Sequence, residues 1–584
     1  MREDTDDHVE DPYTVGGAGP VDGSGSGDGD NPDASQTAND GDSSDDGDEN
    51  RHVFWADEVA DLIEDRDPTD PIVIKGGISP SGVPHLGNVN EIMRGYFVAE
   101  VLRERGHEVR QVFTADDRDP LRKLPRTLAD LDGELVGLGD VDAGALGRNL
   151  GVPYTDVPDP FGCCDSYGDH FSRFIEQSAD LLGANIDVLS TTDLYENGDL
   201  EAVTRRVLER RERAAEVLGA YQDTVDDSYV PFNPICERCG KVTDTVLSVD
   251  LASGTVDYEC TDLEAGNRTI EGCGHRGTAT LREGKLPWRF EWPAQWEVLG
   301  VDFEPFGKDH AEGSWPSGVD IARNVLEIEP PVPMVYEWFT LNGEPFSSSA
   351  GNVILVQEVL TLIEPDVLRY FFAKNPRKAR DFDVSTLDQL VDEFDRVEAI
   401  YFGEVEPADE REEALARRVY PFVVEDVRED RVRIPYRFAA VLGMADDPAL
   451  REEIARREGH IPDDAPAWAV EAALDRVDRA RAWARLTDNE YNYEVKRGAL
   501  PDVELDSNVA AALDELADFV ETDPGPDELQ GEIYETARRH DVDIGEFFSV
   551  GYRLFFGQEQ GPKLGPFLSQ LDREFVVRRL RRQG

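Results

Sequence analysis

The sequence has 584 residues, with 59 lysines and arginines against 123 aspartates and glutamates, and a formal net charge of −64. This length suits several domains with large cores. The charge excludes a plain basic nucleic-acid binder, and no apolar run approaches the ~20 residues that a membrane span needs.

The excess of acid has two explanations. The first is adaptation to a very salty cytoplasm, where high net charge maintains solubility and about 1 M salt shortens the screening length to about 3 Å. The second is that the acidic surface serves to avoid binding polyanions. We favour the first, which leaves short-range contacts with RNA possible, because acidic residues occur along the whole chain. The six cysteines are too few for a disulfide scaffold, and without an apolar leader we expect a cytoplasmic location.

Residues 1–50 are predicted to form a disordered acidic tail. They contain 16 acidic residues and one basic residue, with runs of Gly, Ser, Asp and Asn. So few apolar groups with so much like charge cannot offset the entropy of ordering the chain. We expect folded structure to begin near residue 53.

Residues 71–113 show the pattern that opens a doubly wound nucleotide-binding fold. The apolar run 71–77 predicts a buried strand. A turn rich in Ser, Pro and Gly follows, and an apolar stripe then predicts a helix over 88–105. A second strand is expected over 108–113. A strand, a glycine-rich turn, a helix and a strand in this order are typical of α/β nucleotide sites.

The remaining chain is predicted to hold an insertion and a helical region. Residues 120–285 are rich in loops, contain all six cysteines, and read as an insertion between two halves of an α/β domain. The α/β pattern returns over 288–354, and beyond residue 365 the pattern is mainly helical, as in 386–402 and 467–486. We therefore expect an α/β domain over 51–364 and a helical region over 365–584.

A candidate phosphate site lies between the first strand and its helix, at Pro84-His85-Leu86-Gly87-Asn88. A helix N-terminus offers unpaired N–H groups and a partial positive charge. Gly87 lets the backbone approach a nucleotide, and His85 can donate a hydrogen bond to a phosphate oxygen. A lone histidine is more often structural, so the position between strand and helix carries this prediction.

Four cysteines predict a structural zinc module within residues 230–280. Cys236 and Cys239 form a C-x2-C pair beside a glycine, and Cys260 and Cys273 follow at intervals of 20 and 12 residues. Such thiolates suit a tetrahedral ion with no open position. His275 could replace Cys273 as a ligand, and free or disulfide-bonded cysteines are the alternative. We interpret the adjacent pair 163–164 as loop residues that cannot easily chelate one ion together.

Several motifs, taken in order, resemble those of the archaeal-type class I lysyl-tRNA synthetases. His85-Leu86-Gly87-Asn88 is similar to the HIGH motif of class I synthetases, and residues 347–354 are similar to the KMSKS motif in its KMSSSKGN form. Further similar segments are residues 76–82, 285–289, 292–296, 304–310 and 561–565. The resemblance runs from about residue 53 to 584 and leaves out the acidic tail.

This resemblance implies a class I synthetase Rossmann-like catalytic domain with a zinc-containing insertion, plus an all-helical C-terminal anticodon-binding domain. It implies that ATP with Mg²⁺ activates L-lysine to lysyl-adenylate, and that lysine then passes to the 3′ end of tRNA-Lys. The implied catalytic residues are His85, Asn88, Ser347, Ser348 and Ser349. The implied ATP contacts are Pro84, His85, Leu86, Gly87, Asn88, Gly307, Lys308, Gly351 and Asn352. The implied lysine contacts are Gly77, Ser79, Asp116, Asp117, Trp288 and His310.

The second motif departs from the family pattern. Pro345-Phe346 stands where the family has Lys-Met, and Ala350 stands where it has the second Lys. Both lysines that would neutralise a triphosphate are therefore absent, in a chain that has nine lysines in all. A loop of serines and glycine can still bind phosphate through backbone N–H groups. Candidate replacement cations are Arg118, Arg122, Lys123 and Lys308.

The expected lysine contacts each have an ordinary structural alternative. Asp116 and Asp117 follow the second strand, at the edge where open α/β sheets place ligand groups, and a carboxylate there could hold an ammonium group. They could equally form an Asx-rich turn with salt bridges to neighbouring arginines. Trp288 and His310 are expected to form walls of the pocket, although a buried tryptophan is more often plain core.

Basic and aromatic residues mix in the C-terminal third, where aromatic rings could stack on bases and arginines could contact phosphates. These residues are Arg479, Arg481, Trp483, Arg485, Tyr491, Tyr493, Lys496, Arg497 and Arg578 to Arg582. The alternative is an amphipathic helix with a solvated basic face. Two other functions remain open: a glutamyl-tRNA synthetase-like ligase, whose pocket needs a cation near Asp116, and a non-catalytic tRNA-binding paralogue.

Overall fold

The computed structural model describes most of the chain as two compact units. One unit comprises residues up to 427 apart from 361–363 and 385–392, and these two segments join 428–584 in the second unit. The described residues are 52–223, 225–226, 229–265, 268–346, 352–445, 447–496, 498, 500, 505–569 and 571–583. The predicted acidic tail, the loop residues Ser347, Ser348, Ser349, Ala350 and Gly351, and Arg497 lie outside them.

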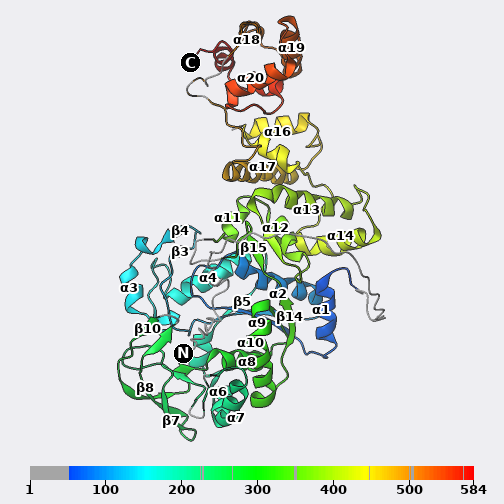
Figure 1. The fold of residues 1–584 in the computed structure, drawn as a ribbon. Helices are drawn as coiled ribbons and strands as arrows, with labels where there is room; N and C mark the ends of the chain where they lie inside the picture. The colour runs from blue at the N-terminus through cyan, green and yellow to red at the C-terminus, as the bar shows by residue number, and fades with distance from the viewer. Residues whose placement is uncertain are drawn as a thin grey trace, which may run out of the picture. The chain divides into compact units, whose positions relative to one another are not determined.

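A parallel sheet of five strands forms the centre of the first unit (Figure 1). Its order is β14-β13-β1-β2-β5, with β1 at Ile72–Ile78, β2 at Val109–Ala115, β5 at Asp187–Ser190, β13 at Phe303–Gly307 and β14 at Val332–Tyr336. Helix α2 (Leu86–Glu104) connects β1 to β2, close to the predicted bounds. The strand order reverses between β1 and β13, and ligands bind at such a switch point beyond the carboxyl ends of the strands.

The central sheet corrects the expected single insertion over 120–285. Strand β5 lies inside this range and pairs in parallel with β2, so the range contains two separate excursions from the sheet. The first carries α3 (Ala143–Arg148) and α4 (Tyr167–Asp180), and the second carries the cysteines 236–273. The strand escaped notice because four residues, Asp187 to Ser190, are too short to show a periodic pattern.

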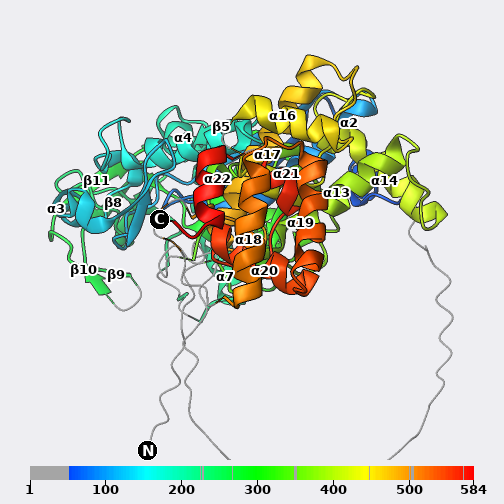
Figure 2. The same cartoon turned by 90° about the horizontal axis from the view of Figure 1, so that it is seen from above.

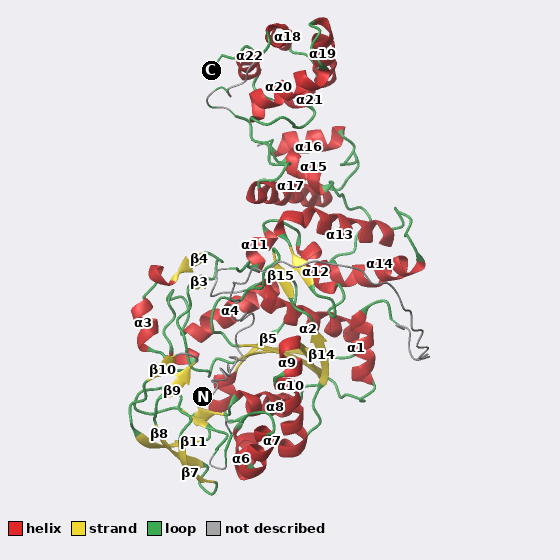
Figure 3. Cartoon of the chain, in the orientation of Figure 1, coloured by secondary structure: helices red, strands yellow, loops and turns green. Residues whose placement is uncertain are grey.

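Short antiparallel strands build the region around the four cysteines. Strands β7 (Val246–Asp250), β8 (Thr255–Glu259) and β11 (Arg276–Thr280) form one sheet. Strands β6 (Asn233–Pro234) and β12 (Gly284–Lys285) pair where the chain enters and leaves it. These strands and their loops appear as a separate group in Figure 3. From β12 the chain runs into α8 (Trp288–Leu299) and returns to the central sheet at β13.

The boundary between the two units differs from the expected boundary at residue 365. Helices α12 (Pro365–Ala373) and α14 (Glu410–Val423) belong to the first unit, as does α1 (Trp55–Glu64). Arg369 of α12 explains part of this difference, because it donates to the carbonyls of Val423 at 2.8 Å and Leu182 at 3.1 Å. A helical pattern alone therefore does not mark the end of an α/β unit.

The second unit is helical and contains α15 (Tyr436–Leu442), α16 (Pro448–Arg457) and α17 (Ala467–Thr487). It continues with α18 (Ser507–Val520), α19 (Pro526–Arg539), α20 (Ile544–Phe556), α21 (Leu564–Leu568) and α22 (Arg573–Leu580), which Figure 2 shows gathered around one core. Among the described helices, none is long and apolar enough to cross a membrane.

Several residues expected to face RNA are buried in this unit. Trp483 is 1 % exposed, and Arg481 is buried and donates to the carbonyl of Tyr493 at 3.1 Å. Arg579 is buried too and donates to the carbonyl of Gly498 at 3.2 Å. These side chains hold helices and connections together, which corrects the expectation that they bind bases or phosphates. Spacing along a helix did not reveal which face packs inward.

Candidate active site

His85 caps helix α2 at the carboxyl edge of the central sheet. Its Nδ1 accepts a hydrogen bond from the N–H of Gly87 at 3.1 Å, and its own N–H donates to Oδ1 of Asn88 at 2.9 Å. A Cβ on residue 87 would lie 2.9 Å from the imidazole ring, so glycine is required there. Burial lowers the pKa of His85 to about 4, so the ring is neutral. Because Nδ1 accepts, Nε2 carries the proton and serves as a donor.

The two motifs, which are far apart in the sequence, meet at this cap. The ring of Phe346 stacks on the ring of His85 with 4.9 Å between centroids and 15° between planes. The N–H of Leu86 donates to the carbonyl of Ile354 at 3.0 Å. Asn352 closes the base of the intervening loop by donating to the carbonyl of Pro345 at 2.8 Å. The phenylalanine that replaces the family's methionine therefore packs on the histidine of the first motif.

Two of the candidate cations have contrasting positions. Lys308 follows β13, is 45 % exposed, pairs with Glu337 at 2.6 Å and lies 5.2 Å from the ring centroid of Trp338. Arg118 is buried instead, and its Nε donates to the carbonyl of Gly284 at 3.0 Å. Lys308 is thus a cation at the ligand edge of the sheet, whereas Arg118 ties the cysteine region to the sheet.

An aromatic wall stands beside β13. Trp288 and Trp292 of α8 stack with 5.1 Å between centroids, and His310 lies 6.2 Å from Trp288 and 5.5 Å from Trp292. The structure therefore brings together the two residues expected to wall the lysine pocket. Behind this wall, Glu304 accepts hydrogen bonds from Lys75 at 2.7 Å and from Trp292 at 2.9 Å. Burial lowers the pKa of His310.

Glu91 on α2 is a site residue that sequence reasoning missed. Its Oε1 accepts the N–H of Gly77 at 2.8 Å, and its Oε2 accepts the hydroxyl of Tyr336 at 3.0 Å. Burial raises the pKa of Glu91 to about 7. Both of these partners are neutral, in contrast to the lysine that pairs with Glu304. One signal was available, because Glu91 is an acid within two turns of His85 on a helix that is otherwise mostly buried.

Asp116 and Asp117 are both buried at the end of β2, but their carboxylates have internal partners. Asp117 accepts the N–H of Thr192 at 2.9 Å and the hydroxyl of Thr191 at 3.2 Å, at the start of α5 (Thr191–Glu196). Asp116 accepts from Nε2 of Gln295 at 3.2 Å. Burial raises the pKa of both groups. This arrangement favours the alternative in which the two carboxylates organise local structure.

Lys285 lies in a buried network that joins the cysteine region to the sheet. It donates to Asp119 and, at 2.8 Å, to Glu291. The hydroxyl of Tyr195 also donates to Glu291 at 2.8 Å and accepts the N–H of Leu286 at the same distance. Because Lys285 stands in β12, this network fixes the end of the cysteine region against α8.

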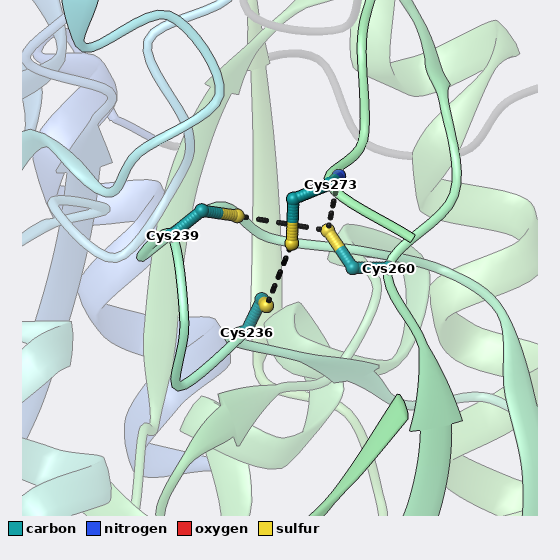
Figure 4. A group of neighbouring side chains, drawn as sticks. All are labelled: Cys236, Cys239, Cys260 and Cys273. Atoms are coloured by element: carbon teal, nitrogen blue, oxygen red, sulfur yellow. Dashed lines mark hydrogen bonds between the residues drawn. The ribbon is translucent and has the colours of Figure 1, made fainter. Parts of the chain in front are cut away.

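The four predicted cysteines converge on one point (Figure 4). The Sγ atoms of Cys236 and Cys273 lie 3.7 Å apart, as do those of Cys239 and Cys260, and all four atoms lie within 4.8 Å of one another. A tetrahedral ion with Zn–S bonds of about 2.3 Å requires sulfurs about 3.8 Å apart. His275 instead pairs with Glu237 at 2.8 Å, so the donor set consists of four thiols.

A second set of possible metal donors includes the cysteine pair 163–164, which lies in a loop as predicted. Ligand atoms of Asp159, Cys163, Cys164 and His170 lie within 4.8 Å of one another. Nε2 of His170 lies 2.9 Å from the carbonyl of Ala129, and donation to it leaves the lone pair of Nδ1 facing the thiols. Asp159 accepts the N–H groups of both cysteines at 2.7 and 2.8 Å. The sequence pattern hid this set because His170 reaches it from helix α4.

Comparison with known proteins shows which proteins this chain resembles. The profile of the family described as tRNA synthetases class I (K) matches residues 53–424. The chain is 70 % identical to the lysine–tRNA ligase of Halobacterium salinarum over 533 residues, which is 91 % of this chain and 97 % of the relative. It is 68 % identical to the enzyme of the same name from Haloarcula marismortui over 91 % and 97 %. Identity to the lysine–tRNA ligase of Pyrococcus horikoshii is 35 %, over 91 % of this chain and all of that one.

Proposed function

The chain belongs to the family of class I (K) tRNA synthetases, and on this premise we propose how its residues activate lysine and charge tRNA. The chain is a lysine-activating enzyme: ATP and lysine give lysyl-adenylate and pyrophosphate, and the lysyl group then passes to tRNA. In the first step the lysine carboxylate attacks the α-phosphorus of ATP. Displacement at phosphorus depends on positioning and on stabilising charge more than on a protein nucleophile.

His85 positions the phosphates of ATP in this proposal. The supporting observation is a neutral imidazole whose Nδ1 accepts from Gly87, so that Nε2–H can donate to an α-phosphate oxygen. The N-terminus of α2 adds backbone donors and a partial positive charge. Asn88 holds the cap in place by accepting the N–H of His85, and the adjacent residues Pro84 and Leu86 are buried.

Glu91 receives the ammonium group of the substrate lysine. Burial raises the pKa of the Glu91 carboxyl group to about 7, and an ammonium group that enters the pocket would form an ion pair with its ionised form. Gly77 and Tyr336 each hold one of the two carboxylate oxygens of Glu91 in place. Ser79 lies two residues after Gly77. Trp288 and His310 line the aliphatic part of the lysine side chain. Glu304 is unsuited to this role because Lys75 already neutralises it.

The phosphate loop 345–352 binds the β- and γ-phosphates without its lysines. Ser347, Ser348, Ser349, Gly351 and Asn352 supply hydroxyl and backbone donors. Gly307, where a Cβ would meet Asp309 and Trp338, directly precedes Lys308 at the sheet edge. Mg²⁺ bound to ATP supplies the remaining positive charge on the triphosphate. This division of roles accounts for an active enzyme with Pro345 and Ala350 in the motif.

Zn²⁺ holds the four-cysteine cluster as a structural ion. The sulfur separations of 3.7 Å match a tetrahedral site, and four thiolates leave no position for substrate. The set of Asp159, Cys163, Cys164 and His170 also has donors that zinc accepts. We further propose that the enzyme works in the cytoplasm on tRNA-Lys and that the helical second unit contacts the anticodon.

Amino-acid-dependent pyrophosphate exchange tests this function. The purified chain, assayed at high potassium chloride, should exchange pyrophosphate into ATP with lysine and not with glutamate. Stimulation by glutamate alone would show a glutamyl-type ligase. Binding of tRNA without exchange for any amino acid would show a non-catalytic paralogue.

A further inference from the structure

A cavity of about 400 Å³ lies in the first unit, apart from the catalytic edge of the sheet. It is bordered by the start of α1, by the end of α12 from Tyr370 and the connection to the first residue of β16 (Arg380–Phe382), by the second half of α13 (Leu387–Tyr401), and by α14. None of the residues placed in the catalytic or zinc sites lines it. Its wall is tied to α2, because Arg94 donates to the carbonyl of Lys374 at 3.0 Å.

The cavity is basic in a chain where acids outnumber bases by two to one. Residues 374–380 comprise four cations and no acid, and they include two of the nine lysines in the sequence. Two of these cations are neutralised: Lys374 by Glu393, and Arg377 by Glu58 at 2.9 Å. Lys378, Arg380 and Arg411 also line the cavity. Among the described residues, no carboxylate lies within 4 Å of these three cations.

Of these three cations, Arg380 gives the strongest indication of an anion site. It is part-buried, and burial lowers the pKa of its guanidinium group. Glu393 offsets this desolvation only in part and forms no ion pair with Arg380, and a bound anion would reduce the remaining penalty through charge-assisted hydrogen bonds. Lys378 and Arg411 are exposed and line the same cavity, so three cations are available to an anionic group that enters it.

The lining of the cavity also includes aromatic and apolar side chains. Trp55 and Tyr370 line the cavity together with Val397 and Leu415. Both rings carry a cation on one face, Arg94 at 5.4 Å from Trp55 and Lys374 at 5.1 Å from Tyr370. An anion alone would leave these aromatic and apolar side chains unused. A nucleotide uses both kinds of lining, with its phosphate on the cations and its base against an aromatic ring.

We propose that this cavity binds one unpaired nucleotide of the tRNA, with its phosphate on Lys378, Arg380 and Arg411 and its base against Tyr370 and Trp55. This inference rests on the proposed function. A nucleotide within a polynucleotide fits better than a free nucleotide because Lys378 and Arg411 are exposed, so phosphates next to the bound one can also reach them. At about 1 M salt, screening beyond about 3 Å leaves direct contacts of this kind as the effective ones.

The test compares two triple variants of the full chain that lose the same charge. Lys378→Gln/Arg380→Gln/Arg411→Gln changes the cavity, and Arg110→Gln/Arg213→Gln/Arg323→Gln changes exposed arginines elsewhere in the same unit. We expect the cavity variant to raise the KM for tRNA in aminoacylation, and the Kd for tRNA, by about tenfold or more. Lysine-dependent pyrophosphate exchange without tRNA should stay within about twofold in both variants.

Three results would overturn the inference. These are an unchanged KM and Kd for tRNA, an equal rise in the control variant, and a raised KM for ATP in exchange, which would show that the cavity takes a free nucleotide. Failure of the unsubstituted chain to exchange pyrophosphate with lysine would instead contradict the proposed function. If the triple variant folds poorly, Lys378→Gln alone, at an exposed position, should still raise the KM for tRNA by about threefold.

Discussion

At the carboxyl edge of the parallel sheet, the apolar strands and helix α2 position polar groups such as Glu91 and His85. We expect the stability of these strands and of α2 not to depend on the two polar side chains. In the four-cysteine region the small core itself includes Cys236 and Cys260, packed with residues such as Tyr258 and Val256. In the first region the functional side chains are therefore carried by a separately folded sheet and helix. In the second region the cysteines themselves are part of the core that holds the region folded. Changes in the two regions should accordingly fail in different ways.

The largest effect is expected for Cys239→Ser in the four-cysteine region. Structural zinc contributes about 10–16 kcal/mol to small metal-dependent folds, so losing one ligand should release about one Zn²⁺ per chain and melt the region well before the rest. The zinc content per chain and the thermal unfolding curve measure these two effects. The control variant is Ser253→Ala, at an exposed turn of the same region. Retention of the full metal content in the cysteine variant would contradict the comparison.

The second effect concerns the catalytic edge, where Glu91→Gln should lower kcat/KM for lysine and leave unfolding unchanged. An ammonium that loses its buried carboxylate loses about 2–5 kcal/mol, which corresponds to about 30-fold to more than 1,000-fold. Pyrophosphate exchange over a range of lysine concentrations measures it. Glu100→Gln, on the same helix and paired with Arg103, is the matched control. Equal activity of the two variants would exclude Glu91 from the lysine pocket.

His85→Ala should slow formation of the adenylate at least about tenfold, or about 1.4 kcal/mol, because the Nε2–H donor is removed. Rapid-quench measurement of adenylate gives the rate. His107→Ala, at the far end of α2, should leave it unchanged. A normal rate in the His85 variant would show that this histidine only caps the helix.

The smallest effect is a pH dependence that arises at the same edge. The raised pKa of Glu91, about 7, means that the free enzyme is protonated there below pH 7 and cannot pair with an ammonium. We therefore expect kcat/KM for lysine to fall by about tenfold from pH 8 to pH 6, while His85, neutral throughout, adds nothing. Glu91→Gln should flatten this profile. A profile that is unchanged in the variant would assign the titration to another group.

The comparison also shows which parts of the site could be predicted. His85, Gly87 and Asn88 could be predicted because a helix cap requires residues within one turn of each other. The four-thiol set was equally accessible through its C-x2-C pair. Glu91 and Tyr336 were missed because they meet across 245 residues and neither belongs to a motif. For Asp117 the sequence left two roles open, because its partners, Thr191 and Thr192, come from a helix that no local pattern connects to it.

The sequence by itself determined the opening strand, turn and helix, the family, the four-cysteine set and the missing lysines of the phosphate loop. Each of these features can be recognised from short local motifs. Only the tertiary structure decided that β5 joins the sheet, that Phe346 stacks on His85, and that His170 completes a second donor set. It also decided which arginines are buried in the helical unit. The physical reason is that burial and pairing depend on distances across the fold, to which spacing along the chain is a poor guide.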